Sequence, residues 1–287
     1  MMTALKWFLL AGIAMCLLVC IWYRLKLAMN SRGVKHEETG WFIGQTTGNK
    51  ELQSDCVQIY QNEAGITAVM ADGIGKENTG KVAAQIAVDT VLDAFEPYRI
   101  LYNPEYLFQT AFLEAHRRIQ KTIGERRGGA SMAMLFVNQT HLYYALAGNI
   151  RIALLRKDEL IPLSKGQTID VLAREAYQEG MLSKNETIWS QTETQIWNYL
   201  GKDGFHEIEI GKPPVSLQKG DLIVMLSQGI YEELSWVEIE EVLLKKITLK
   251  EKAGSIIEET EKKETPDKEN GSVLLLAAEV RNETSQF

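Results

Sequence analysis

Cysteine is scarce in this sequence, and its placement excludes a disulfide framework. Only three cysteines occur among 287 residues. Cys16 and Cys20 lie in an apolar N-terminal run, which leaves Cys56 as the single cysteine of the remaining chain. Small secreted domains that are held together by disulfides need several cysteines outside such a run. The sequence therefore does not belong to that class, and it is consistent with a reducing compartment.

Positive charge is also in short supply. Lysine and arginine total 31 against 38 aspartates and glutamates, which gives a net charge of -7 and an isoelectric point near 5.3. A protein that binds a nucleic-acid backbone usually presents a basic face. We therefore expect no nucleic-acid partner, and we expect any phosphate-binding site to be local.

Two common catalytic arrangements are missing. The sequence has no Gly-x-Ser-x-Gly elbow, so it lacks the exposed nucleophilic serine of that strand-turn-helix motif. The four histidines are scattered, and none has the spacing of a metal-ligand pair; they are His36, His116, His141 and His206. We interpret each histidine as structural or exposed rather than catalytic.

Long apolar runs are limited to one, from Trp7 to Tyr23, which contains no charged residue. As a helix it would span roughly 26 Å, the short end of the length that crosses a membrane. Aromatic residues bracket the run, and basic residues follow it more than they precede it. This pattern predicts a single-pass anchor in the cell membrane with the large domain in the cytoplasm. The alternative, a cleaved signal peptide, would need a shorter apolar region and a small-residue cleavage pattern after Tyr23.

The chain divides into five regions on these grounds. Hydrophobic residues make up 45% and charged residues 24%, which is ordinary for a folded domain in water. Apolar patterning begins at Trp41 after a polar, charged stretch. We expect an N-terminal tail (1–6), a transmembrane helix (7–23), a juxtamembrane linker (24–39), one folded domain (40–282) and a C-terminal tail (283–287).

Strand-like and helix-like patterns occur in separate groups. Short β-type runs separated by turn residues lie at 56–60, 66–71, 131–137, 141–147 and 151–156, and later at 222–226 and 272–280. Apolar residues with helical spacing lie at 83–94 and 108–123, and a charged helix is predicted at 251–263. Ser235 and Glu238 form a capping-box pattern at the start of another helix. This grouping favours a layered α+β domain with antiparallel hairpins.

The segment from 66 to 91 predicts a strand, a glycine-bearing turn and a helix, and it admits two phosphate chemistries. Gly75, Gly80 and Lys81 match the start of a P-loop, whose backbone amides bind phosphate. Val82 occupies the position where a P-loop has a Mg²⁺-binding hydroxyl, so nucleotide binding stays a remote alternative.

The second chemistry begins with Asp72, which we place at the end of the strand, followed by Gly73. A carboxylate and a backbone carbonyl at adjacent residues are hard oxygen donors that suit Mg²⁺ or Mn²⁺. A simple Asp-Gly turn gives the same two letters. The choice between these interpretations depends on other motifs in the chain.

The stretch VMADGIGKENTGKVAAQIAV resembles a signature of the protein phosphatase 2C family, the PPM-type metal-dependent Ser/Thr protein phosphatases. Further resemblance follows in order through GGASMAMLFV, GDLIVMLSQGIYEELSWVEI and ENGSVLLLAAEV, and covers the chain from about Trp41 to about Val280. The chain is identified as a divergent, bacterial-like member. The resemblance implies two packed antiparallel β-sheets flanked by helices, an α-β-β-α sandwich.

The resemblance also implies a chemistry, in which water bridging two Mn²⁺ or Mg²⁺ ions attacks phosphoserine or phosphothreonine. Asp72 and the carbonyl of Gly73 match the pair that bridges the metals, and Asp55 matches an acidic residue that precedes them. Lys50 stands about where the family often has a phosphate-gripping arginine, and lysine keeps the charge without the bidentate geometry. An exposed surface lysine is the alternative role for Lys50.

Two departures from the family pattern fall on its metal ligands. The Ser-Asp-Gly motif is here Ser227-Gln228-Gly229, so a carboxylate has become a neutral amide at Gln228. The closing Asp-Asn is here Glu269-Asn270, and the added methylene of Glu269 displaces its carboxylate. Asp267 would replace it only if the loop shifted. We expect reduced occupancy by Mn²⁺ or Mg²⁺, with two ions at most.

Three functions follow from these observations. The first is a pseudophosphatase at the membrane, which binds a phosphoprotein or a kinase-like signalling partner with impaired or absent hydrolysis. The second is an active Mn- or Mg-dependent protein Ser/Thr phosphatase. The third and most remote is a nucleotide-binding protein. Trp189, Trp197 and Tyr199 lie in a stretch that is variable in the related family, where they make either a partner surface or core contacts.

Overall fold

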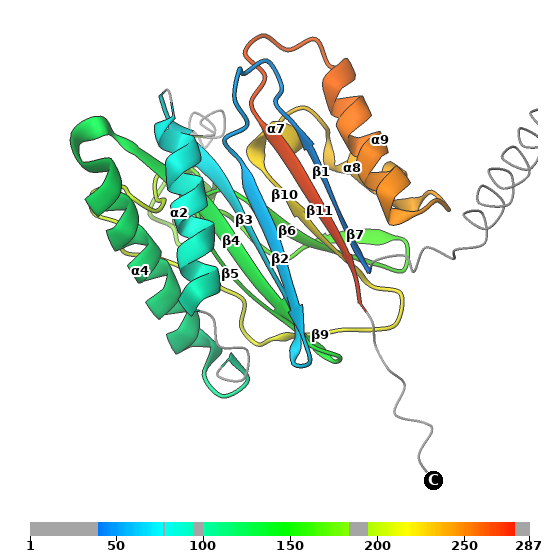
Figure 1. The fold of residues 1–287 in the computed structure, drawn as a ribbon. Coiled ribbons are helices and arrows are strands. Elements are labelled where there is room, and N and C mark those ends of the chain that lie inside the picture. Colours follow the sequence, from blue (N-terminus) through cyan, green and yellow to red (C-terminus); the bar gives the residue numbers. More distant parts are fainter. Residues whose placement is uncertain (1–39, 77, 95–99, 184–194, 279–287) are drawn as a thin grey trace, which may run out of the picture. The chain divides into compact units, whose positions relative to one another are not determined.

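The computed structural model describes residues 40–76, 78–94, 100–183 and 195–278. Two β-sheets lie face to face in the described part, and helices cover the outer face of each (Figure 1). The expected transmembrane helix at 7–23 lies outside the described residues, as do the linker and both tails. Within the described ranges, no helix is long and apolar enough to cross a membrane.

The first sheet has five antiparallel strands in the order β1-β11-β10-β6-β7. Their bounds are β1 (Trp41–Thr46), β6 (Arg151–Arg156), β7 (Glu159–Pro162), β10 (Leu222–Leu226) and β11 (Gly271–Ala277). Every residue of β10 is buried, because this central strand is covered on both faces. The register places Thr46 opposite Gly271 and Leu226 opposite Val273, so one end of each strand meets at the same edge.

The second sheet has the order β2-β3-β4-β5-β8, with the short β9 also pairing with β5. Its strands are β2 (Cys56–Asn62), β3 (Gly65–Gly75), β4 (Gly128–Val137), β5 (His141–Ala147), β8 (Glu209–Ile210) and β9 (Val215–Ser216). The sequence placed Asp72 at the end of its strand, whereas β3 continues to Gly75. The strand continues because β4 begins at Gly128 and supplies partners, with Ser131 opposite Asp72.

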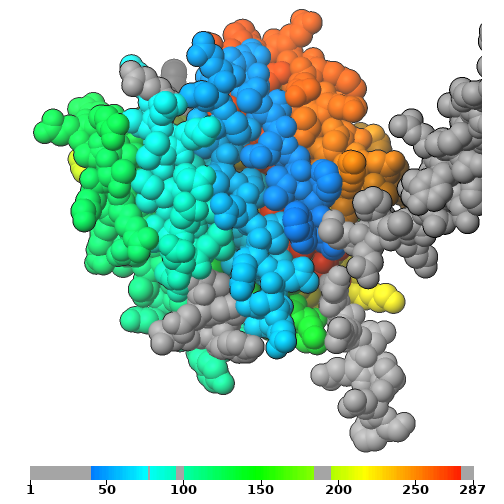
Figure 2. All heavy atoms as spheres, in the orientation of Figure 1, coloured from blue at the N-terminus to red at the C-terminus, as the bar shows by residue number. Residues whose placement is uncertain are grey.

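Helices pack on both outer faces. They are α2 (Thr79–Ala94), α4 (Pro104–Ile123), the 3₁₀ turn η1 (Gly124–Arg126), α5 (Ile169–Gln178), α7 (Gln228–Tyr231), α8 (Trp236–Leu244) and α9 (Leu249–Lys262). The predicted capping box is present, since the Ser235 side chain accepts from the Glu238 amide and Glu238 returns a hydrogen bond. In the face that Figure 2 shows, α2 and α4 cover one flank, α9 covers the other, and the β1–β2 region lies between them.

Three clusters of buried apolar residues separate the four layers. One lies between the β2–β5 sheet and helices α2 and α4, and it includes Ala87, Phe108 and Phe112. The second fills the space between the two sheets, and the third lies between the β10–β11 sheet and helices α7 to α9. Burial of this much apolar surface is the main stabilising term for such a sandwich. The architecture confirms the predicted α+β class with two antiparallel sheets flanked by helices.

Candidate active site

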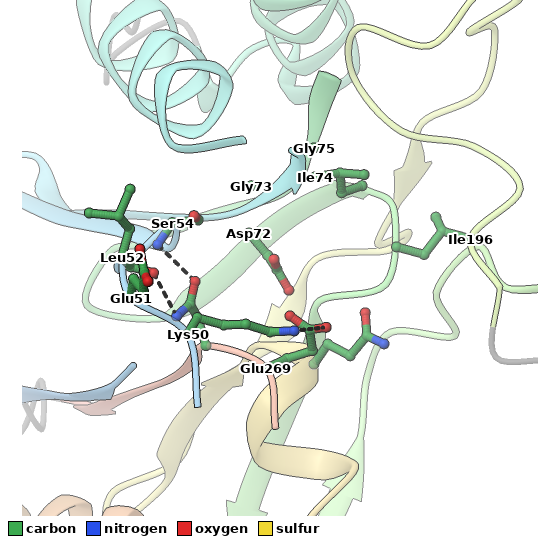
Figure 3. A pocket seen from close by; sticks show the side chains of 12 residues that line it. Lys50, Glu51, Leu52, Ser54, Asp72, Gly73, Ile74, Gly75, Ile196 and Glu269 are labelled. Atoms are coloured by element: carbon green, nitrogen blue, oxygen red, sulfur yellow. Dashed lines mark hydrogen bonds and ion pairs between the residues drawn. The ribbon is translucent and has the colours of Figure 1, made fainter. Parts of the chain in front are cut away.

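A cleft of about 470 Å³ lies at the edge where β1, β10 and β11 end or begin, next to the last residues of β3. The residues that line it come from distant parts of the chain; they are Lys50, Glu51, Leu52, Ser54, Asp72, Gly73, Ile74, Gly75, Ile196, Gln228, Glu269 and Asn270 (Figure 3). Five of the six residues predicted from the sequence are among them. The sixth, Asp55, lies beneath the cleft.

Asp55 joins the two sheets from a buried position just before β2. Its Oδ2 atom accepts hydrogen bonds from the Oγ of Ser227 at 2.8 Å and the Oγ of Ser272 at 2.7 Å. Its Oδ1 atom is buried without a hydrogen-bond partner among the described residues. Burial raises the pKa of Asp55 to about 6, although both serine hydroxyls lower it. One oxygen of Asp55 therefore holds the scaffold, and its carboxyl group lies beside that of Asp72 beneath the cleft.

Asp72 points into the cleft from β3, toward Lys50 and Glu269 (Figure 3). Burial raises the pKa of Asp72 well above its usual range, and the nearby charge of Asp55 raises it further, while the backbone N–H of Gln228 lowers it. Two carboxyl groups held this close disfavour joint ionisation unless a cation lies between them. The pair is therefore electrostatically suited to a divalent cation.

Gly73 follows Asp72 and lets helix α2 approach the strand closely. A Cβ atom on Gly73 would lie 2.3 Å from the carbonyl oxygen of Gly80 and 2.8 Å from that of Ser54, closer than any side chain tolerates. Only glycine fits between these backbones. The close packing fixes the position of the Asp72–Gly73 backbone at the wall of the cleft.

Gln228 opens α7 directly after β10, and both polar ends of its side chain are engaged by neighbours. Its Oε1 accepts a hydrogen bond from Nδ2 of Asn149 at 2.8 Å, and its Nε2 donates to Glu232 at 2.7 Å. Asn149 is itself buried, and its Oδ1 accepts from the Oγ of Ser131 at 2.9 Å. The amide of Gln228 is thus part of a hydrogen-bonded chain that runs through Asn149 to Ser131 of β4, the residue opposite Asp72.

Lys50 and Glu269 form an ion pair across the cleft. The Nζ of Lys50 lies 3.0 Å from Oε1 of Glu269, as Figure 3 shows, and their side chains are 36% and 51% exposed. The ammonium group of Lys50 therefore lies at the cleft, and it already contacts the carboxylate of Glu269. Asp267, the alternative carboxylate, is exposed and does not line the cleft.

The chain is similar to several known proteins. No protein-family model matches the chain. The chain is 25% identical over 228 residues to the protein phosphatase PhpP of Streptococcus pneumoniae, covering 75% of this chain and 87% of that protein. It is 26% identical over 215 residues to the serine/threonine phosphatase stp of Listeria innocua, covering 72% and 82%. The solved serine/threonine phosphatase of S. agalactiae has 22% identity and a TM-score of 0.71, covering 83% of this chain and 99% of that one.

The chain is similar in sequence to these bacterial protein phosphatases, and it shares the fold of solved PPM-type serine/threonine phosphatases. Another solved structure with the same fold is the catalytic domain of the phosphatase PstP in complex with two manganese ions, at 18% identity and a TM-score of 0.62, covering 83% of this chain and 96% of that one. In PstP this fold holds two manganese ions, so the oxygen donors of the cleft decide what the present chain can hold.

The oxygen donors around Asp72 suit a hard divalent cation. The carboxylate of Asp72, the carbonyl of Gly73 and the Oδ1 of Asp55 are hard oxygens, and Mg²⁺ is commonly held by one or two carboxylates with water completing its shell. The oxygen of Gln228, by contrast, accepts from Asn149, and Glu269 is paired with Lys50. Across the described ranges, no three His, Cys, Asp or Glu side chains gather closely enough to hold a metal ion.

Two residues that organise the PPM-type cleft were missed from the sequence. Asn149 engages Gln228, and its only sequence signal is a polar residue between two apolar strands. Asn270 is 6% exposed; its Oδ1 accepts from the N–H of Ser54 at 2.9 Å, and its Nδ2 donates to the carbonyls of Thr47 and Leu52. The neighbouring motif pointed to Glu269 as a ligand and left the role of Asn270 unassigned.

The P-loop alternative does not match the described part of its segment. Gly80 lies in the first turn of α2, where a Cβ atom would stand 2.7 Å from the carbonyl oxygen of Gly73. The helix start therefore packs onto β3, and a phosphate group has no room there. Lys81 is exposed and does not line the cleft.

Proposed function

We propose that this chain is a PPM-type domain that retains a phosphate-binding cleft, is impaired or inactive in hydrolysis, and binds a phosphoprotein or kinase-like signalling partner. The observation that carries the proposal is the side chain of Gln228, whose oxygen and nitrogen are both engaged by Asn149 and Glu232. A neutral amide whose oxygen and nitrogen are already hydrogen-bonded to neighbouring side chains is a poor replacement for a carboxylate ligand. The family position that it occupies is thereby closed to a second ion.

The loss matters because of what a pair of bound ions supplies. Two divalent ions lower the pKa of a water molecule, fix it in place and neutralise charge on the phosphoryl oxygens. Changes to ligands and to the groups around them commonly reduce affinity or activity by ~10- to 100-fold. With Gln228 neutral and Glu269 paired to Lys50, we expect one ion at Asp72 and slow or absent turnover.

Binding of a phosphate group draws on features that remain. Lys50 supplies a cation at the mouth of the cleft, and Asn270 fixes the loop that carries Lys50 through three hydrogen bonds. A phosphate group carries more charge than a carboxylate, so it competes with Glu269 for Lys50. These features support binding of a phosphorylated partner without requiring that the phosphoryl group be transferred.

The decisive experiment measures hydrolysis of a phosphothreonine peptide in Mn²⁺ by the full chain and by the double variant Gln228→Asp, Glu269→Asp. The proposal predicts little turnover by the wild type and a gain of about 100-fold or more in the variant. Asp158→Asn, an exposed change in the β6–β7 turn, serves as the control. Fast wild-type turnover that Asp72→Asn abolishes would overturn the proposal. A double variant that binds two ions and remains silent would show that the metal ligands are not the cause.

The same assay decides a second candidate, an active Mn- or Mg-dependent Ser/Thr phosphatase. Asp55, Asp72 and Gly73 favour this candidate, because they keep the part of the site that fits one ion. The sequence relatives support it as well, since they are named protein phosphatases. The active candidate predicts substantial wild-type turnover and little gain from the double variant.

We also propose that residues 7–23 anchor this domain in the cell membrane with its cleft in the cytoplasm. The support is the uncharged run, its flanking aromatic residues and the basic residues that follow it. The chain should remain with the membrane fraction after alkaline carbonate washing, and deletion of residues 2–23 should release it. Release of the intact chain by the wash would contradict the anchor.

A further inference from the structure

Lys268 lies next to the candidate ligand Glu269, and its side chain is turned away from the cleft. The residue is only 5% exposed. Its Nζ donates to the carbonyl oxygens of Thr260 at 2.9 Å, Glu261 at 3.1 Å and Lys263 at 2.6 Å. A lysine ammonium has three donors, so all of them are used.

The three acceptors lie at the C-terminal end of α9, which explains why a buried cation is stable there. The last four carbonyls of a helix have no partner within the helix, and the helix dipole makes this end negative. The ammonium of Lys268 supplies donors to these carbonyls, adding a second to that of Thr260, which also accepts from the N–H of Lys263, and it supplies the complementary charge. The side chain therefore fastens the turn 267–271 to the end of α9.

The backbone of the same turn supports the loop that carries Lys50. The carbonyl oxygen of Lys268 accepts a hydrogen bond from the N–H of Asn49 at 3.0 Å. Gly48 adopts a φ of +58°, and a Cβ atom there would lie 2.3 Å from the carbonyl oxygen of Glu269 and 2.6 Å from that of Lys268. The two backbones are thus in direct contact at Lys268 and Glu269.

The side chain of Asn270 binds this loop from the other side of Glu269. It accepts from the N–H of Ser54 and donates to the carbonyls of Thr47 and Leu52. The loop 47–54 is therefore held at both ends by the turn 267–271, and Lys50 lies between the two attachments. The distance between Lys50 and Glu269 depends on where that turn is fixed.

We propose that Lys268 is a positioning residue of the cleft, which holds Glu269 opposite Lys50 by fixing the turn 267–271 to the C-terminal end of α9. The ligand that this geometry serves, a divalent cation with a phosphate group, rests on the proposed function. The positioning itself does not depend on it. A second tether, from the hydroxyl of Thr46 to Oε1 of Glu261 at 2.9 Å, keeps β1 attached to α9 when the ammonium is removed.

The test compares the full chain with Lys268→Met, which keeps the length of the side chain and removes its donors. Hydrogen exchange of the amides in the loop 47–54, Asn49 and Ser54 in particular, should become about tenfold faster. This corresponds to a decrease of about 1.4 kcal/mol in the free energy of opening that protects these amides. The dissociation constant for inorganic phosphate, measured with Mn²⁺ present, should rise about tenfold, because the loop no longer holds the phosphate contact Lys50 in place. Lys268→Arg, which keeps a cation with several donors, should restore part of both effects.

The matched control is Leu243→Ala in α8, which removes buried apolar volume beside α9 and lowers stability without touching the turn. Lys268→Met and Leu243→Ala are compared at equal distance below their melting temperatures. If both variants exchange the loop amides equally fast, Lys268 is only a stabilising contact and the inference is wrong. If the wild type binds no Mn²⁺, the proposed function fails, and the exchange comparison still decides the role of Lys268.

Discussion

The cleft has two walls that differ in how their oxygen atoms are used. The early wall consists of Asp55, Asp72 and Gly73, and the late wall consists of Gln228 and Glu269. In the early wall, one oxygen of Asp55 has no hydrogen-bond partner among the described residues, and the Asp72 carboxylate points into the cleft. In the late wall, the oxygen of Gln228 accepts from Asn149, and Glu269 contacts Lys50.

The difference is that the polar groups of Gln228 and Glu269 already have partners in the structure around them. The early wall is costly while no cation is bound, because burial raises the pKa values of both aspartates and the charge of Asp55 raises that of Asp72 further. The late wall has neighbours for its polar groups and gains little from a cation. The early wall therefore has more to gain from a bound cation than the late wall has.

The largest expected effect comes from the early wall. Asp72→Asn removes the carboxylate that points into the cleft, and the dissociation constant for Mn²⁺ should rise roughly 100-fold or more. Isothermal titration calorimetry measures it, and Asp158→Asn should leave it unchanged. Equal affinity in Asp72→Asn and the wild type would show that the early wall does not hold the ion.

The next effect tests the late wall. Asn149→Ala deprives the oxygen of Gln228 and the buried hydroxyl of Ser131 of a partner, which should lower the free energy of unfolding by about 1–3 kcal/mol. Chemical denaturation measures this loss, with the exposed change Gln139→Ala as the control. A loss no larger than that of the control would mean that the hydrogen-bonded chain through Asn149 does not stabilise the late wall.

A smaller effect depends on pH and concerns the protein kept free of metal with EDTA. Because the folded-state pKa of Asp55 is raised from 3.8 to about 6, ionisation near Asp72 destabilises the fold as the pH rises through this window. Burial also raises the pKa of Asp72, and Asp72→Asn removes this buried acid and its share of the loss. The melting temperature of the variant should therefore exceed that of the wild type by a margin that grows from about pH 4 to about pH 6. A margin that shrinks over this window would contradict the raised pKa of Asp72.

The smallest effect concerns the ion pair between the walls. Lys50→Met should change the free energy of unfolding by less than about 1 kcal/mol, because both partners are partly exposed and water screens their attraction. Urea denaturation at low and high salt measures it, with Lys157→Met in the β6–β7 turn as a comparison. A loss of several kcal/mol would mean that the pair is a structural element rather than an available phosphate contact.

Much of the fold could be predicted because its signals are local. The strands around 131–137 and 141–147 are continuous β-type runs with a turn between them, and the structure has β4 and β5 there. Ser235 and Glu238 marked a helix start that the structure confirms. Two of the missed strands have no local signal: β8 and β9 have two residues each and exist because β5 offers an open edge. Strand β1 depends on β11, more than 200 positions away.

Several residues that line the cleft could be predicted from the sequence, but the contacts between their side chains could not. The motifs predicted that Asp72, Gln228 and Glu269 lie together, and in the structure all three line one cleft. The partners of these side chains could not be read from spacing. Asn149 reaches Gln228 across 79 positions, and Lys50 meets Glu269 only because the turn beside Lys268 is fixed to α9. Such contacts depend on how distant backbones pack.

The number of Mn²⁺ ions bound per full chain, counted by isothermal titration calorimetry, tests the central claim most directly. The account predicts one ion in the wild type, and a second in the Gln228→Asp, Glu269→Asp variant. Two ions bound by the wild type with similar affinity would contradict it, because the late wall would then supply the oxygens that we assign to Asn149 and Lys50.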